Sequence, residues 1–115
     1  MSEYQEQCSL VEWFRVRYPD RIINADMGGV RLTMGNAIKA KRAGHLKGYP
    51  DLFIAVAKGG YYGLFIEMKT KKGKASNEQE EIIKKLNQEG YYAIICYGFD
   101  NAMKTINDYM RLKGE

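Results

Sequence analysis

The sequence predicts an α/β fold with a mixed central sheet flanked by helices. Two consecutive runs, LFIAVA at 52–57 and YYGLFIEM at 61–68, are apolar on both faces, as strands of a covered sheet are. A third such run, YYAIICY at 91–97, lies between two segments with helical periodicity. At 115 residues the chain is long enough for one hydrophobic core, so we expect a single domain over 1–115.

The first half of the chain predicts two helices and a short strand. Leu10 and Phe14 lie on the apolar face of an amphipathic helix expected over 3–18, and Pro19 ends this helix. Residues 21–24 are expected to form a short strand, and the glycine-rich stretch 25–36 a loop. Residues 36–43 predict a basic helix closed by a glycine.

The second half predicts a hairpin followed by a helix, a strand and a helix. Lys58-Gly59-Gly60 forms the hairpin turn. Ser76 or Asn77 begins a helix that has acidic residues in its first turn and ends at Glu89. Because this helix crosses between strands, strand 91–97 is expected to lie parallel to strand 61–68. A last helix is expected over 101–112.

Positive charge is concentrated in the middle of the chain. Residues 31–74 carry ten Lys and Arg against two acids, a net +8, whereas the rest carries eight bases and twelve acids, a net −4. Such a stretch predicts an anionic partner such as a phosphate backbone, although a solvated basic surface explains the charge alone equally well.

We expect a cytoplasmic protein without a membrane partner, and the sequence is compatible with either a phage or a bacterial origin. No apolar run approaches the roughly 20 residues that span a bilayer, and the N-terminal MSEYQEQ is too polar for a secretory signal. Cys8 and Cys96 are far apart and lack metal-site spacing, so we expect free thiols in a reducing compartment.

The two acids of the basic stretch fall at the same end of the hairpin. If the turn centres on Gly59, residues whose numbers sum to 118 face each other, and Asp51 lies opposite Glu67; a two-residue turn would shift this pairing by one. Two facing carboxylates repel unless a cation neutralises them, and oxygen ligands suit Mg²⁺ or Mn²⁺. Lys69 shares a strand face with Glu67. A simple surface ion pair of Glu67 and Lys69 is the alternative, worth under about 1 kcal/mol.

These residues resemble a known nuclease pattern. Pro50-Asp51 followed by Glu67-Met68-Lys69 is similar to the PD-(D/E)xK motif. The wider text, GYPDLFIA, YYGLFIEMKTKKGKASNEQ and LNQEGYYAIICYG, resembles the virus-type replication-repair nuclease (VRR-NUC) domain from about Glu3 to Tyr109. The resemblance implies a restriction-endonuclease-like fold, a catalytic Lys69 and a metal held by Asp51, Glu67 and the Met68 carbonyl.

Two helix residues join the site by the same resemblance. Gln79 matches a glutamine behind the site, and Glu3 matches an acid of the N-terminal helix, with Glu6 as its alternative. For Gln79 the competing interpretations are a surface helix residue and a residue that hydrogen-bonds within the first turn of its helix; for Glu3 the competing interpretation is a frayed, solvent-exposed terminus. The text at 25–27 departs from the family, so the loop there is assigned no role beyond DNA contact.

Basic side chains around the site are expected to contact DNA phosphates. They are Arg31, Lys39, Lys41, Arg42, Lys47, Lys71, Lys72 and Lys74. His45, the single histidine, is expected to be a polar surface residue. The tyrosine pairs 61–62 and 91–92 are expected to pack in the core or at strand edges rather than to stack on bases.

The predicted function is a Mg²⁺- or Mn²⁺-dependent endonuclease that hydrolyses DNA without a small-molecule cofactor. The resemblance implies branched DNA as substrate, such as a four-way (Holliday) junction in DNA repair. Symmetric cutting of a junction needs two sites, so we expect a twofold homodimer whose interface involves the helix with Trp13 or the Gly28-Gly29 loop. The alternatives are a non-catalytic DNA-binding module and, less favoured, a sequence-specific restriction-type nuclease.

Overall fold

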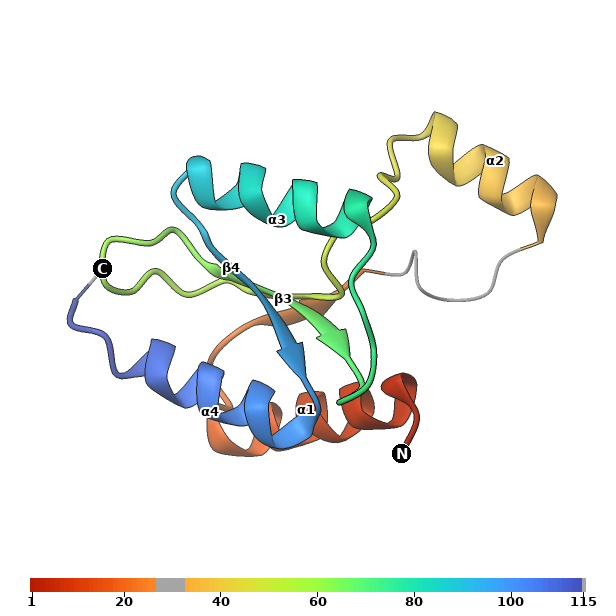
Figure 1. Ribbon diagram of the computed structural model, residues 1–115. Helices are drawn as coiled ribbons and strands as arrows, with labels where there is room; N and C mark the ends of the chain where they lie inside the picture. The colour runs from red at the N-terminus through yellow and green to blue at the C-terminus, as the bar shows by residue number, and fades with distance from the viewer. Residues whose placement is uncertain (27–32, 115) are drawn as a thin grey trace.

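The computed structural model describes residues 1–26 and 33–114, and it confirms the mixed α/β fold (Figure 1). The elements, in chain order, are α1 (Glu3–Arg17), β1 (Ile23–Ala25), α2 (Met34–Arg42), β2 (Leu52–Ile54), β3 (Leu64–Lys69), α3 (Asn77–Gln88), β4 (Tyr92–Tyr97) and α4 (Phe99–Met110). Arg31 and the Gly28-Gly29 loop lie outside the described residues.

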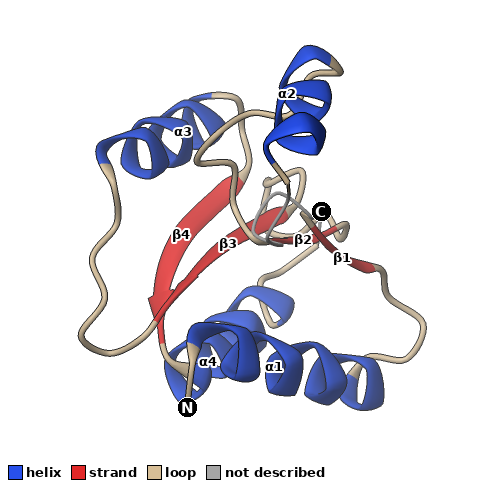
Figure 2. Ribbon diagram, turned by 90° about the vertical axis from the view of Figure 1, so that its right-hand side faces the viewer, coloured by secondary structure: helices blue, strands red, loops and turns tan. Residues whose placement is uncertain are grey.

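The four strands form one sheet in the order β1-β2-β3-β4. The first three are antiparallel neighbours, and β4 pairs parallel to β3, as the crossover through α3 predicted. Helices α1 and α4 cover one face of the sheet and α3 lies on the other (Figure 2). This layering gives each strand one face toward the α1/α4 layer and one toward the α3 side.

The main hydrophobic core lies between the sheet and the α1/α4 layer. Alternate side chains of β3, namely Leu64, Ile66 and Met68, pack there with Leu10 and Phe14 of α1, as the apolar stripe predicted. The intervening β3 side chains therefore point toward the α3 side. One of them is Glu67, which is 2% exposed. Among the described residues it is the charged side chain that is buried.

The hairpin has the predicted register but shorter strands. Leu52 pairs with Ile66 and Ile54 with Leu64, so paired numbers sum to 118. The turn itself is a two-residue Gly59-Gly60 turn with both φ angles positive, closed by a bridge between residues 58 and 61. The register and the two-residue turn are compatible because the residues between the ladder and the 58–61 bridge are not paired in the sheet.

A close contact lies next to the end of the ladder. A Cβ at Gly63 would lie 2.6 Å from the Phe53 ring, so only glycine admits that ring across the hairpin. The predicted strands 52–57 and 61–68 are correct in place and wrong in extent. One further step of the same register sets Asp51 opposite Glu67.

The other element boundaries shift by at most two residues. Helix α4 begins at Phe99 rather than at 101, since Glu6 of α1 accepts a hydrogen bond from the Phe99 N–H at 3.2 Å. The Asn101 amide oxygen instead accepts from the Tyr97 N–H. Thr33 caps α2 two residues earlier than predicted, and β1 spans 23–25 rather than 21–24.

Two further observations bear on the composition. No helix of the described residues is both long and apolar enough to cross a membrane. Cys8 and Cys96 are free thiols, and Cys96 is fully buried.

Ser76 fixes the start of α3, and its loss should be measurable. The Ser76 hydroxyl accepts from the Gln79 N–H at 3.1 Å, and the Gln79 side chain accepts from the Ser76 N–H at 2.9 Å. We expect Ser76→Ala to lower the free energy of unfolding by about 1 kcal/mol in urea denaturation. Ser9→Ala, inside α1, is the control and should change stability little, because alanine is the better helix former.

Candidate metal centre

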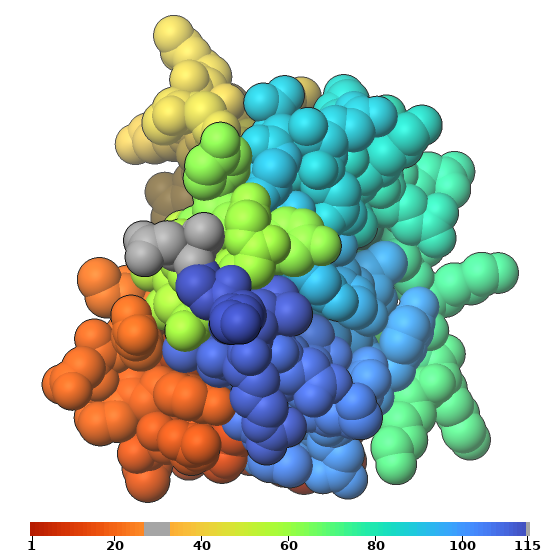
Figure 3. Space-filling model, turned by 90° about the vertical axis from the view of Figure 1, so that its left-hand side faces the viewer, coloured from red at the N-terminus to blue at the C-terminus, as the bar shows by residue number. Residues whose placement is uncertain are grey.

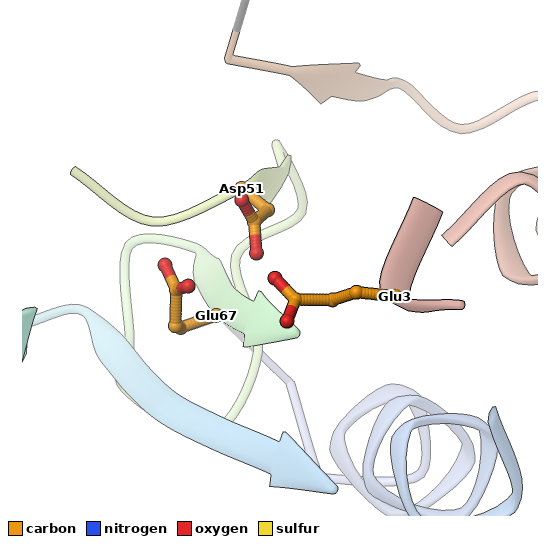
Figure 4. Close-up of side chains that lie close together, drawn as sticks. All are labelled: Glu3, Asp51 and Glu67. Carbon is orange, nitrogen blue, oxygen red and sulfur yellow. The ribbon is translucent and has the colours of Figure 1, made fainter. Parts of the chain in front are cut away.

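Three carboxylates from separate parts of the chain converge at one end of the hairpin (Figure 4). Glu3 comes from the first turn of α1, Asp51 directly precedes β2, and Glu67 lies within β3. One oxygen from each lies within 4.8 Å of the others. The structure therefore brings together the three acids that the sequence singled out.

Asp51 is held by the backbone on both sides. The Met68 N–H donates to Asp51 Oδ2 at 2.7 Å, and the Asp51 carbonyl accepts from the Asp26 N–H at 2.8 Å. Pro50, just before it, is fully buried. Because the N–H and C=O of one strand residue point to the same neighbouring strand, the Met68 carbonyl faces the Asp51 side too. That direction suits its predicted role as a ligand.

Glu67 has one satisfied oxygen and one free oxygen. Its Oε2 accepts from Gln79 Nε2 at 3.0 Å and lies 3.6 Å from Lys69 Nζ. Its Oε1 is buried and has no hydrogen-bond partner among the described residues. A buried oxygen without a partner is costly, so this atom marks a position where a ligand would stabilise the fold.

Gln79 connects the start of α3 to the site. Its amide oxygen caps the helix at Ser76, and its amide nitrogen holds Glu67. Gln79 therefore makes the first-turn hydrogen bond of the alternative interpretation and also contacts Glu67 from behind the site, so both interpretations describe it.

The choice between Glu3 and Glu6 follows from their contacts. Ser2 and Gln5 form a capping box that fixes the first turn of α1, where Glu3 joins Asp51 and Glu67. Glu6, one turn later, is directed to the N-terminus of α4, where it accepts from Phe99. Glu3 is therefore the acid of α1 that faces the other two carboxylates.

The electrostatics of the site indicate an excess of negative charge. Burial, and then the neighbouring Asp51, raise the pKa of Glu67 to about 8. Burial also raises the pKa values of Asp51 and Glu3, although the Met68 N–H bond opposes this at Asp51. Lys69 is one cation against three acids, so protons or a further cation must neutralise the rest.

The donor set suits a hard divalent cation. All candidate ligand atoms are oxygens, and the free Oε1 of Glu67 supplies an unused acceptor among them. Mg²⁺ and Mn²⁺ prefer such carboxylate and carbonyl oxygens, whereas zinc prefers His and Cys. The residues present therefore fit the predicted ion.

The predicted DNA-contacting residues lie around this centre to different extents. Lys39, Lys41 and Arg42 are on α2, which buries none of its side chains and protrudes from the body (Figure 3). Lys71, Lys72 and Lys74 lie in the loop between β3 and α3. Lys47 is highly exposed and pairs with Glu78 at 3.6 Å.

Sequence reasoning missed Asp26. It extends β1 by one residue in the register that pairs Ala25 with Leu52, so it faces Asp51, whose pKa its charge raises further. Its Oδ1 lies 4.0 Å from Nδ1 of His45, which the sequence had left as a surface residue. If the predicted strand 21–24 had been extended by two residues, it would have included Asp26.

Comparison with known proteins agrees with the geometry. The VRR-NUC domain model matches residues 1–100. The chain belongs to the VRR-NUC family. A solved structure titled "VRR_NUC domain protein" is 32% identical, with 98% of this chain and 91% of that chain covered and a TM-score of 0.82.

No curated protein matches the chain. VRR-NUC membership nevertheless identifies a nuclease-type domain that processes DNA, and it agrees with the acidic site described above. In this VRR-NUC domain the acids, the lysine and the glutamine of the predicted motif lie around one point.

Proposed function

We propose that this VRR-NUC domain is a Mg²⁺- or Mn²⁺-dependent endonuclease that hydrolyses phosphodiesters in branched DNA. The observation that carries the proposal is the buried Glu67 carboxylate, which lies beside two further acids, has one oxygen without a hydrogen-bond partner among the described residues, and neighbours Lys69 through its other oxygen. A site that only bound DNA would gain nothing from acids that repel phosphate.

The proposed roles follow from the contacts. Asp51, Glu67 and the Met68 carbonyl hold the ion, and Glu3 completes the acidic side of the site. When bound, the ion polarises the phosphate and lowers the pKa of water. Lys69, whose side chain is only 13% exposed, orients or deprotonates the attacking water or stabilises the developing negative charge.

Recognition is proposed to depend on the DNA backbone and shape. The described basic residues lie on α2, at Lys47 and in the 70–75 loop. The described residues include no helix-turn-helix that would read bases in a major groove. Symmetric cutting of a four-way junction further requires a twofold dimer. Trp13 packs edge-on against Tyr18 and Phe99 within one chain, so its part in an interface stays a prediction.

Metal dependence is the direct test of the proposal. Labelled four-way junction and linear duplex are incubated with the protein in Mg²⁺, in Mn²⁺ or in EDTA, and products are resolved on denaturing gels. We expect cleavage of the junction in either metal and none in EDTA. Junction binding without cleavage in any metal would instead indicate a DNA-binding module, and discrete bands from plasmid DNA a sequence-specific nuclease.

The protruding α2 is expected to contribute phosphate contacts. Lys41→Ala with Arg42→Ala should lower junction affinity and reduce the slope of log affinity against log salt by about 2. Lys104→Ala with Arg111→Ala removes equal charge from α4, where both side chains pair with Asp108, and should leave the slope unchanged. Equal slopes for the two double variants would remove α2 from the DNA interface.

A further inference from the structure

A cavity of about 270 Å³ lies beside the carboxylates on the same face of the sheet. Among the described residues its lining is largely aromatic, with two polar side chains at one side: Tyr49, Phe53, Phe65, Tyr91, Asn24 and Asp26. Pro50, the neighbour of Asp51, also lines it. Pockets for drug-sized ligands measure about 300–1,000 Å³, so this one has room for a smaller, single ring system.

The sheet register connects the cavity to the metal centre. Asn24, Phe53 and Phe65 lie opposite one another across β1, β2 and β3, and the row two residues further on contains Asp26, Asp51 and Glu67. Side chains two apart in a strand share a face and lie about 7 Å apart. The aromatic row and the acidic row are therefore neighbours on the α3 side of the sheet.

One face of the Phe53 ring packs against another ring, and the other face is directed toward the edge strand β1. Its ring stacks on Phe65 at 4.3 Å and 27°, and Tyr91 contacts it edge-on. Both of these contacts come from the β3 side. On the other side the register places the exposed Asn24, whose side-chain amide donates a long hydrogen bond of 3.4 Å to the adjacent Ala25 carbonyl.

The polar groups suit the edge of a base. The Asn24 amide offers a donor and an acceptor, and the Asp26 carboxylate offers acceptors. Burial, followed by Tyr91 and Asp26, raises the pKa of Tyr49, so its hydroxyl stays neutral. A flat ring held by aromatic side chains with its polar edge toward amide and hydroxyl groups is how proteins bind unpaired bases.

We propose that this cavity binds one unpaired nucleobase of the DNA, next to the phosphate held at the carboxylates. This inference rests on the proposed nuclease function and deepens it, because it selects DNA with an unpaired nucleotide near the cut. It also gives Phe53 and Tyr91 a role besides packing, contrary to the sequence expectation for Tyr91.

The test removes the base and the ring separately. Forked DNAs with a single abasic analogue at each unpaired position near the fork are bound by fluorescence anisotropy in Ca²⁺, which also accepts oxygen ligands. At one position we expect base removal to weaken wild-type binding about tenfold, the scale of one base stacked on an aromatic ring. The same removal should change binding by Phe53→Leu less than twofold.

Two further variants keep the test clear of folding effects. Asn24→Ala, at an exposed position, should also reduce the sensitivity to base removal. Val16→Ala is the control, since Val16 is 82% exposed on α1, which covers the other face of the sheet, and it should keep the wild-type sensitivity. If wild type and Phe53→Leu respond equally at every position, the base-binding proposal is wrong.

Cleavage distinguishes this failure from failure of the nuclease proposal. Wild-type cleavage in Mg²⁺ without any base-specific loss would overturn the cavity alone. A base-specific loss that depends on Phe53, with no cleavage in Mg²⁺ or Mn²⁺, would support the cavity and overturn the nuclease.

Discussion

Glu67→Gln is expected to abolish cleavage while making the metal-free protein more stable at alkaline pH. Loss of this ligand removes several kcal/mol of transition-state stabilisation, so cleavage should fall by about a thousandfold or more. The amide removes a buried charge that repels Asp51, which is why the fold should gain. The Glu67 carboxylate is thus needed for cleavage but lowers the stability of the metal-free protein at alkaline pH.

The pH dependence of stability follows from the sign of the shift. The pKa of Glu67 is about 8 in the folded protein, against an ordinary value of 4.5, so the folded state binds this proton more tightly than the unfolded state. The contribution is fully present below pH 4.5 and is lost as the pH rises through about 8, a change on the order of a few kcal/mol. Glu67→Gln should flatten this decline.

Urea denaturation in EDTA at several pH values between 4.5 and 9 measures the effect, with the exposed Glu80→Gln as control. Added Mg²⁺ or Mn²⁺ should restore wild-type stability at alkaline pH and leave Glu67→Gln unchanged, because metal binding and protonation compete for the same oxygens. Parallel curves for wild type and Glu67→Gln would mean that Glu67 is not the proton-binding group.

Lys69→Ala is expected to abolish cleavage and to spare both metal and DNA binding. Its ammonium group neighbours Glu67 Oε2, which Gln79 still holds after the substitution. Removal of one charge that acts on the transition state costs about 10²–10³-fold in rate. The acids that would bind the metal and the basic side chains that would contact DNA are unchanged in this variant.

Single-turnover cleavage and anisotropy on the same junction separate these effects. The control Lys104→Ala lies on α4 and is 76% exposed, and it should cleave as wild type does. Metal-induced stabilisation of Lys69→Ala in thermal unfolding should match the wild type. Cleavage by Lys69→Ala at the wild-type rate would remove Lys69 from the chemistry.

The hairpin shows what local sequence can predict here. The predicted register, in which paired numbers sum to 118 and Asp51 faces Glu67, is confirmed, although the turn it assumed is wrong: the turn has two residues, and the pairing shifts by one between the turn and the ladder. The extent of the strands was not predicted, and neither was the close approach of the Phe53 ring to Gly63, where a side chain would have no space. That contact exists only in the folded hairpin.

The distant parts of the site needed tertiary information. The position of Glu3 beside residues about fifty further along came from a family resemblance, not from helix periodicity. Asp26 and the aromatic cavity depend on the pairing of β1 with β2, and a three-residue edge strand carries little signal of its own. Glu6 was a reasonable alternative to Glu3 until its contact with α4 was visible.

The double use of Gln79 constrains what this position can become. Glutamate serves as well as glutamine in the third position of a capping box, so helix formation alone accepts either residue. Glutamate has no N–H to offer the buried Glu67 oxygen and would add a fourth acid to the cluster. Gln79→Glu would therefore leave the cap of α3 intact but disturb the carboxylate site. The helix accepts either residue at this position, whereas the site requires glutamine.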